Sequence, residues 1–164
     1  GYDVYDWGLG RNGGDVDHYI VEVGDRVRQL HAALDEQPMT LIGWSLGGVI
    51  ARETARLYEP YVREVITLGT PIIGGPKYTA AAKRFSEYAG LDLDDFEKHV
   101  HERNSKGIRQ PVTSIYSKLD GIVGWQASVD IYNEQARNIE VYSSHFGIGA
   151  NGKVWRLIAD ILAG

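Results

Sequence analysis

The sequence predicts an α/β protein whose mostly parallel sheet is flanked by helices, and three observations lead to this fold class. Short apolar segments typical of strands alternate with longer segments typical of helices. In the longer segments, apolar residues recur every three to four positions, which is the period of one helix face. The apolar run at 39–44 passes through a glycine-framed turn directly into a segment compatible with a helix. No internal repeat or low-complexity linker interrupts the pattern, so we expect one domain over residues 1–164.

The composition is typical of a globular protein and narrows the classes of partner. The net charge of −5 gives no reason to expect nucleic acid or an anionic membrane as a partner. No apolar run approaches the roughly 20 residues that span a bilayer, so no stable membrane insertion is expected. The absence of cysteine excludes disulfides, thiolate catalysis and cysteine-based zinc sites, and leaves the cellular compartment open.

The first half of the chain begins with a predicted short strand at 2–7 and a glycine-rich loop at 8–14. A helix is predicted over 15–34 from apolar residues that share one face, namely Ile20, Val23, Val27, Leu30 and Leu34. Asp15 and Asp17 lie at its start, where the helix dipole favours negative charge. After Pro38 we expect a strand at 39–44, a helix that ends near residue 58, and a strand at 62–68.

The second half contains a longer region, 72–110, that we interpret as a small cap- or lid-like insertion. A helix is predicted within it at 77–88, and a shorter charged helix with loops at 91–106. Apolar runs predict strands at 111–117 and 139–142. The closing helix at 151–162 is predicted from one apolar face made of Val154, Leu157, Ile158, Ile161 and Leu162.

The segment 41–48 contains the pattern Gly-x-Ser-x-Gly directly between a strand and a helix. This is the sequence form of a nucleophile elbow, a strained turn that raises the hydroxyl of Ser45 above a parallel sheet. We expect glycine at 43 and 47 because side chains there would collide where strand and helix approach each other. With 20 glycines in the chain, the pattern needs support from its surroundings.

A serine hydroxyl needs a histidine to take its proton and an acid to fix the histidine tautomer. In elbow-type hydrolases these follow the serine in the order acid, then histidine, just past the ends of later strands. His145 alone among the five histidines meets this condition, since His18 and His31 precede Ser45 and His99 and His101 lie in the charged insertion. Asp120 follows the strand at 111–117 and precedes His145. Its competitors are expected to be solvated, namely Asp94, Asp95, Asp130 and Glu140.

Three segments of this chain resemble the α/β-hydrolase superfamily, particularly its lipase-like esterases. The segment 43–52 is similar to the elbow and following helix of that group. The strand and Gly-Thr-Pro turn at 65–71 and the Ser-His-Phe-Gly segment at 144–147 also have counterparts there. The resemblance implies Ser45 as nucleophile, His145 as base and Asp120 as orienting acid, with no metal or cofactor. It also implies that the backbone N–H of Leu46 is one donor of the oxyanion hole.

The sequence departs from the family pattern at its start. Family members usually carry an earlier strand followed by a His-Gly or Pro-Gly loop that supplies the second oxyanion donor, and neither pair occurs in the first forty residues. Three alternatives follow: the loop 8–14 or the Asn12 amide replaces that donor, a second chain completes the site at an exposed sheet edge, or the chain is a fragment or a naturally shortened variant with low activity. Of these we expect a shortened, weakly active hydrolase that associates with itself.

The resemblance and the motifs together predict a serine hydrolase that cleaves small-molecule or lipid-like carboxylic esters through an acyl-enzyme. The alternatives are a thioesterase or acyltransferase, which use the same intermediate, and a non-catalytic binding or assembly module. Candidate substrate-binding residues are the aromatic side chains near strand ends or in the insertion, which are Trp7, Trp44, Tyr78, Trp125 and Phe146.

Overall fold

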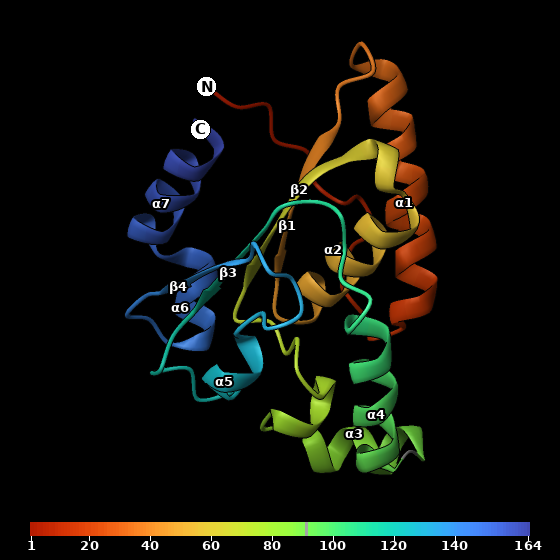
Figure 1. Cartoon of the computed structure of the whole chain (residues 1–164), viewed down its shortest axis with the longest axis vertical. Coiled ribbons are helices and arrows are strands. Elements are labelled where there is room, and N and C mark those ends of the chain that lie inside the picture. The colour runs from red at the N-terminus through yellow and green to blue at the C-terminus, as the bar shows by residue number, and fades with distance from the viewer. Residues whose placement is uncertain (91) are drawn as a thin grey trace.

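The computed structural model describes residues 1–90 and 92–164, and in them four parallel strands form one sheet with helices on both faces (Figure 1). The strands are β1 (Met39–Trp44), β2 (Val62–Leu68), β3 (Val112–Tyr116) and β4 (Arg137–Glu140), in the order β1-β2-β3-β4. Each is parallel to its neighbour. The fold class predicted from the sequence is therefore confirmed.

Two separate apolar cores hold the helices to the sheet. On one face, α1 (Val16–Ala33) and α2 (Leu46–Leu57) pack through Val27, Ala51 and Ala55 against Val65 of β2. On the other face lie α6 (His145–Ala150) and α7 (Gly152–Leu162). The residues of this second core are Ile66, Leu68, Ile115, Ile148, Val154 and Ile158. Val65 and Ile66 point to opposite faces because side chains alternate along a strand, so the apolar run of β2 is buried on both sides.

Polar side chains mark the starts of the helices. The Asp15 carboxylate accepts from the N–H of His18 at the start of α1, as the acidic residues there indicated. Asp92 accepts from Asp94 and Asp95 at the start of α4 (Leu93–Asn104), and Asn151 accepts from Lys153 at the start of α7. Each cap satisfies backbone donors that the first helical turn leaves without a partner.

Region 72–110 contains η2 (Gly75–Tyr78), α3 (Ala82–Ala89) and α4, which lie beyond the carboxyl ends of β1 and β2 (Figure 1). The helix predicted at 77–88 is confirmed only from Ala82 onward: the chain turns after Tyr78, where Thr79 is extended and pairs with Val123. Leu91, the first residue of the predicted charged helix, lies outside the described residues. Lys77 joins η2 to α4 through ion pairs with Asp94 and Glu97, and their hydrogen bonds raise the Lys77 pKa.

Four further elements differ from the sequence prediction. Residues 2–7 form no strand, and the Tyr2 hydroxyl instead donates to the carbonyl of Ala159 in α7 (3.0 Å). Strand β4 begins at Arg137, two residues earlier than predicted. The short helices α5 (Trp125–Ser128) and α6 lie in segments for which no helix was predicted. A strand needs a neighbour to pair its backbone, and apolar alternation alone does not reveal whether one is present.

Candidate active site

Ser45 lies in the turn between β1 and α2, in a backbone conformation that is rare outside glycine. Its φ is +53° and its ψ is −123°, which costs on the order of 1–3 kcal/mol. The turn is held by the Ser45 N–H, which donates to the Leu68 carbonyl of β2 (2.8 Å), and by the Gly48 N–H, which donates to the Ser45 carbonyl (3.0 Å). The strain thus occurs where the elbow motif predicted it.

Two glycines allow strand, helix and the next turn to approach each other. A Cβ at Gly43 would lie 2.4 Å from the Gly47 carbonyl oxygen, so the expectation for Gly43 is confirmed. The expectation for Gly47 is wrong, because a Cβ there would meet nothing within 4 Å. The second close approach is at Gly48, where a Cβ would lie 2.0 Å from the Thr70 hydroxyl.

A hydrogen-bonded chain connects Ser45, His145 and Asp120. His145 Nε2 lies 3.0 Å from Ser45 Oγ, and His145 Nδ1 lies 2.7 Å from Asp120 Oδ2. A carboxylate accepts the Nδ1 proton, which leaves the Nε2 lone pair facing the serine hydroxyl. The side chains of His145 and Asp120 are only 4% and 2% exposed. The geometry therefore permits proton transfer from Ser45 to a shielded imidazole.

Each partner of Ser45 is held by local backbone bonds. Asp120 follows β3, and its Oδ1 accepts the N–H groups of Ile122 and Val123, both at 2.9 Å. His145 begins α6, where the Ser144 hydroxyl caps the helix by accepting from the Gly147 N–H (3.2 Å). Because Asp120 Oδ1 already has two donors, its Oδ2 is directed at the imidazole.

Two positions that the sequence analysis did not single out fit around this chain. The buried Ser117 Oγ accepts both the Leu119 N–H (3.1 Å) and the Ser143 N–H (3.2 Å), so one hydroxyl joins the loops that carry Asp120 and His145. Gly69 has a φ of +54°, and a Cβ there would lie 2.9 Å from Asp120 Oδ2. In the sequence, the available signals were that Ser117 directly follows β3 and that Gly69 directly follows β2. Neither signal reveals which residues these two contact in space.

The oxyanion expectations concern Leu46 and the loop at 8–14. Leu46 is the first residue of α2, so its N–H belongs to the turn whose donors lack an acceptor within the helix. The contacts of the loop lie at the start of α1, where the Gly13 N–H donates to the Tyr19 hydroxyl (3.0 Å). The Asn12 side-chain oxygen accepts the Gly14 N–H (2.9 Å). The first contact ties the loop to α1, and the second lies within the loop. β1 is an edge strand of the sheet in the described residues.

The aromatic candidates divide into three groups by position. Trp44 and Phe146 flank His145, with ring centroids 5.3 Å and 5.8 Å from the imidazole. Trp125 stacks on Tyr116 of β3, and the backbone of Tyr78 pairs with Gly124, so both lie beside the Asp120 loop. Trp7 packs on Tyr19 at the start of α1 (5.0 Å). Of the five, only Trp44 and Phe146 therefore have ring contacts with His145.

The other histidines do not join this chain in the described residues. His18, His99 and His101 are exposed, and His31 packs edge-on against Tyr61. No group of three or more metal-ligating side chains is found in the part of the chain that the structure describes. No helix of residues 1–90 and 92–164 is long and apolar enough to cross a membrane.

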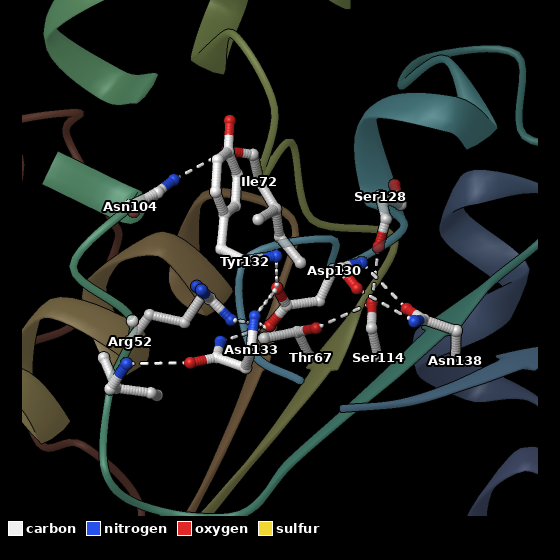
Figure 2. A network of polar contacts seen from close by, with 12 residues as sticks. Arg52, Thr67, Ile72, Asn104, Ser114, Ser128, Asp130, Tyr132, Asn133 and Asn138 are labelled. Carbon is white, nitrogen blue, oxygen red and sulfur yellow. Dashed lines mark hydrogen bonds and ion pairs between the residues drawn. The ribbon is translucent and has the colours of Figure 1, made fainter. Parts of the chain in front are cut away.

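The expectation that Asp130 is solvated is wrong, because Arg52 of α2 pairs with it inside the protein (Figure 2). Arg52 Nη1 lies 2.6 Å from Asp130 Oδ2, and the two side chains are 2% and 0% exposed. Asp130 also accepts from Asn133 Nδ2 (2.7 Å) and the Tyr132 N–H (2.9 Å). Burial by itself raises the pKa of Asp130, but the Arg52 charge and these hydrogen bonds outweigh it and hold the pKa below its ordinary value.

The same network crosses the sheet next to Asp130. Thr67 of β2 donates to Ser114 of β3 (3.1 Å), and Ser114 donates to the carbonyl of Ser128 at the end of α5. The Asp130 N–H donates to the Asn138 side chain of β4 (2.8 Å). The last two bonds attach residues 128–130 to β3 and β4, and the Arg52 pair attaches them to α2.

A family model described as alpha/beta hydrolase fold matches residues 7–105, which is more than half of the chain. The protein belongs to the α/β-hydrolase fold family. No curated protein matches the sequence. The family assignment agrees with the strained elbow and the parallel sheet described above.

Several solved structures of lipases and esterases share the fold of this α/β hydrolase. A lipase-esterase related protein from Clostridium acetobutylicum is 21% identical, with a TM-score of 0.66 over 92% of this chain and 77% of its own. The Bacillus licheniformis lipase BlEst2 is 15% identical, with a TM-score of 0.66 over 90% of this chain and 74% of its own. A Paleococcus ferrophilus monoacylglycerol lipase is 15% identical, with a TM-score of 0.63 over 94% and 76%. At these identities the likeness establishes the fold.

Proposed function

We propose that this α/β hydrolase is a serine esterase that cleaves carboxylic esters through an acyl-enzyme. The observation that carries the proposal is the hydrogen-bonded chain from Ser45 Oγ through His145 to Asp120 Oδ2, with distances of 3.0 Å and 2.7 Å. Nucleophile, base and orienting acid come from three separate loops, and a purely structural role requires no such convergence.

The geometry supports the following sequence of bond changes. His145 Nε2 takes the Ser45 hydroxyl proton while Oγ attacks the ester carbonyl carbon, and the carbonyl oxygen becomes an oxyanion. Collapse of this intermediate breaks the bond to the alcohol oxygen, which receives the proton from His145. Water then attacks the acyl-enzyme with His145 as base, and the carboxylic acid leaves as the proton returns to Ser45. Asp120 stays ionised throughout and stabilises the imidazolium.

The Leu46 N–H is the proposed donor to the oxyanion. It follows the nucleophile directly and begins α2, so the positive end of the helix dipole lies at the developing charge. A donor of this kind contributes about 3–4 kcal/mol to transition-state stabilisation in a serine hydrolase. The proposed substrates are small or lipid-like esters, whose apolar part can contact the exposed ring of Phe146 beside His145.

A labelling experiment tests the nucleophile directly. A fluorophosphonate should label the wild-type protein at Ser45, and Ser45→Ala should lose both the label and p-nitrophenyl ester hydrolysis, the latter by at least about 10³-fold. A Ser45→Ala protein that keeps its hydrolysis would overturn the assignment. Parallel turnover of matched esters and thioesters distinguishes the esterase from the thioesterase, and failure of the folded wild type to react would favour a binding module.

A further inference from the structure

The indole of Trp44 connects the residue before the nucleophile with the backbone of the base. Trp44 is the last residue of β1 and is joined to Ser45 by a peptide bond. Its Nε1–H donates to the carbonyl oxygen of His145 at 3.0 Å. The same ring lies beside the imidazole, with centroids 5.3 Å apart and planes inclined by 38°.

The geometry points to Trp44 as a positioning residue that sets the separation of Ser45 and His145. This inference rests on the proposed function. The Ser45 Oγ to His145 Nε2 contact is one hydrogen bond between a side chain of the β1–α2 turn and one of α6. The Trp44 bond joins the adjacent residue, at the end of β1, to the backbone of α6 through a second, independent path. Two connections between these neighbouring segments and α6 restrict the rotation that one connection allows.

The other contacts of the indole agree with a fixed ring. Gly149 of α6 lies against it, since a Cβ there would be 3.7 Å from the ring, and Phe146 packs at a centroid distance of 5.8 Å. The indole therefore contacts two residues one helical turn apart on α6: it donates a hydrogen bond to His145 and packs beside Gly149. Trp44 nevertheless stays 39% exposed, and replacement of its N–H removes the hydrogen bond without opening a buried cavity.

Trp155 of α7 provides a matched control within the same helix packing. Its Nε1–H donates to the Gly149 carbonyl of α6 at 2.9 Å, and the residue is 47% exposed. Trp44→Phe and Trp155→Phe thus each remove one indole bond to a carbonyl of α6, and only the first removes it at His145.

The test compares these two variants in steady-state ester hydrolysis. We expect Trp44→Phe to lower kcat by about 5- to 10-fold, as loss of one hydrogen bond and a fraction of an ångström in position would do, with KM unchanged. Trp155→Phe should keep the wild-type kcat. Equal losses in both variants would reduce Trp44 to a structural residue, and a raised KM with unchanged kcat would make it a substrate contact; either result overturns the inference.

Fluorophosphonate labelling separates failure of this inference from failure of the proposed function. The reaction needs His145 to remove the Ser45 hydroxyl proton, so Trp44→Phe should be labelled about 5- to 10-fold more slowly than the wild type, and Trp155→Phe at the wild-type rate. No labelling of the folded wild type would refute the esterase. Equal labelling rates in wild type and Trp44→Phe would refute the role of Trp44 and retain the esterase.

Discussion

Replacement of Gly69 by alanine should disturb the Asp120–His145 pair without a change to either residue. A Cβ at position 69 would lie 2.9 Å from Asp120 Oδ2 and 3.3 Å from His145 Nδ1. Ordinary van der Waals contact begins near 3.4 Å, so the carboxylate oxygen must move by about 0.5 Å. The bond to His145 Nδ1 is already short at 2.7 Å and the Oδ1 atom is held by two N–H groups, so this movement misdirects the imidazole.

The expected magnitude follows from that displacement. A misplacement of 1 Å in a catalytic arrangement costs about 10²-fold in rate, so about 0.5 Å should lower kcat/KM by roughly 10-fold. Gly69 also has a φ of +54°, and alanine in that conformation should lower the free energy of unfolding by about 1–2 kcal/mol. The strain affects stability, whereas the contact with Asp120 affects catalysis.

Gly90→Ala separates these two effects. Gly90 has a similar φ of +62°, but a Cβ there would meet nothing within 4 Å. Ester hydrolysis should be measured for both variants at one temperature, at which separate urea titrations show that each variant is folded in the absence of urea. The reasoning is refuted if Gly69→Ala keeps the wild-type kcat/KM, or if Gly90→Ala loses as much activity.

Three further predictions concern the buried polar groups. Arg52→Met should lower the free energy of unfolding, measured in urea titrations, by about 3–5 kcal/mol, because it leaves the buried carboxylate of Asp130 ionised and without its cation. Adding Asp130→Asn should recover part of this loss, and additive losses in the double variant would contradict the pairing. The folded-state pKa of Asp130 is depressed, so its contribution to stability is present above the unfolded pKa of 3.8 and lost as the pH falls through the folded value. Between pH 6 and pH 2, the free energy of unfolding of the wild type should therefore fall more steeply below about pH 4 than that of Asp130→Asn. Ser117→Ala should lower kcat by about 10-fold, because the Leu119 and Ser143 N–H groups lose their common acceptor. Ser117→Thr keeps a hydroxyl and should retain more of the wild-type kcat than Ser117→Ala. Equal kcat values for wild type and Ser117→Ala would refute the role of Ser117 in joining the two loops.

The sequence by itself determined the elements whose physics is local. The apolar run of β2 and the apolar faces of α1 and α7 depend on periodicity, and each was predicted close to its observed bounds. The elbow at Ser45 was also predicted, because the need for glycine at 43 and the position of the serine between strand and helix act within a few residues. The order of Asp120 and His145 after successive strands also followed from chain order alone.

Only the tertiary structure decided which side chains meet. Asp130 has an ordinary loop sequence, and its burial depends on Arg52, which lies 78 positions earlier in the chain. Gly69, Ser117 and Trp44 act on the Asp120 and His145 loops through contacts between different strands and helices. Residues 2–7 were predicted as a strand and form none, since pairing requires a partner in space. Periodicity records which face of an element is buried, whereas distances between elements arise only when the sheet and its helices pack.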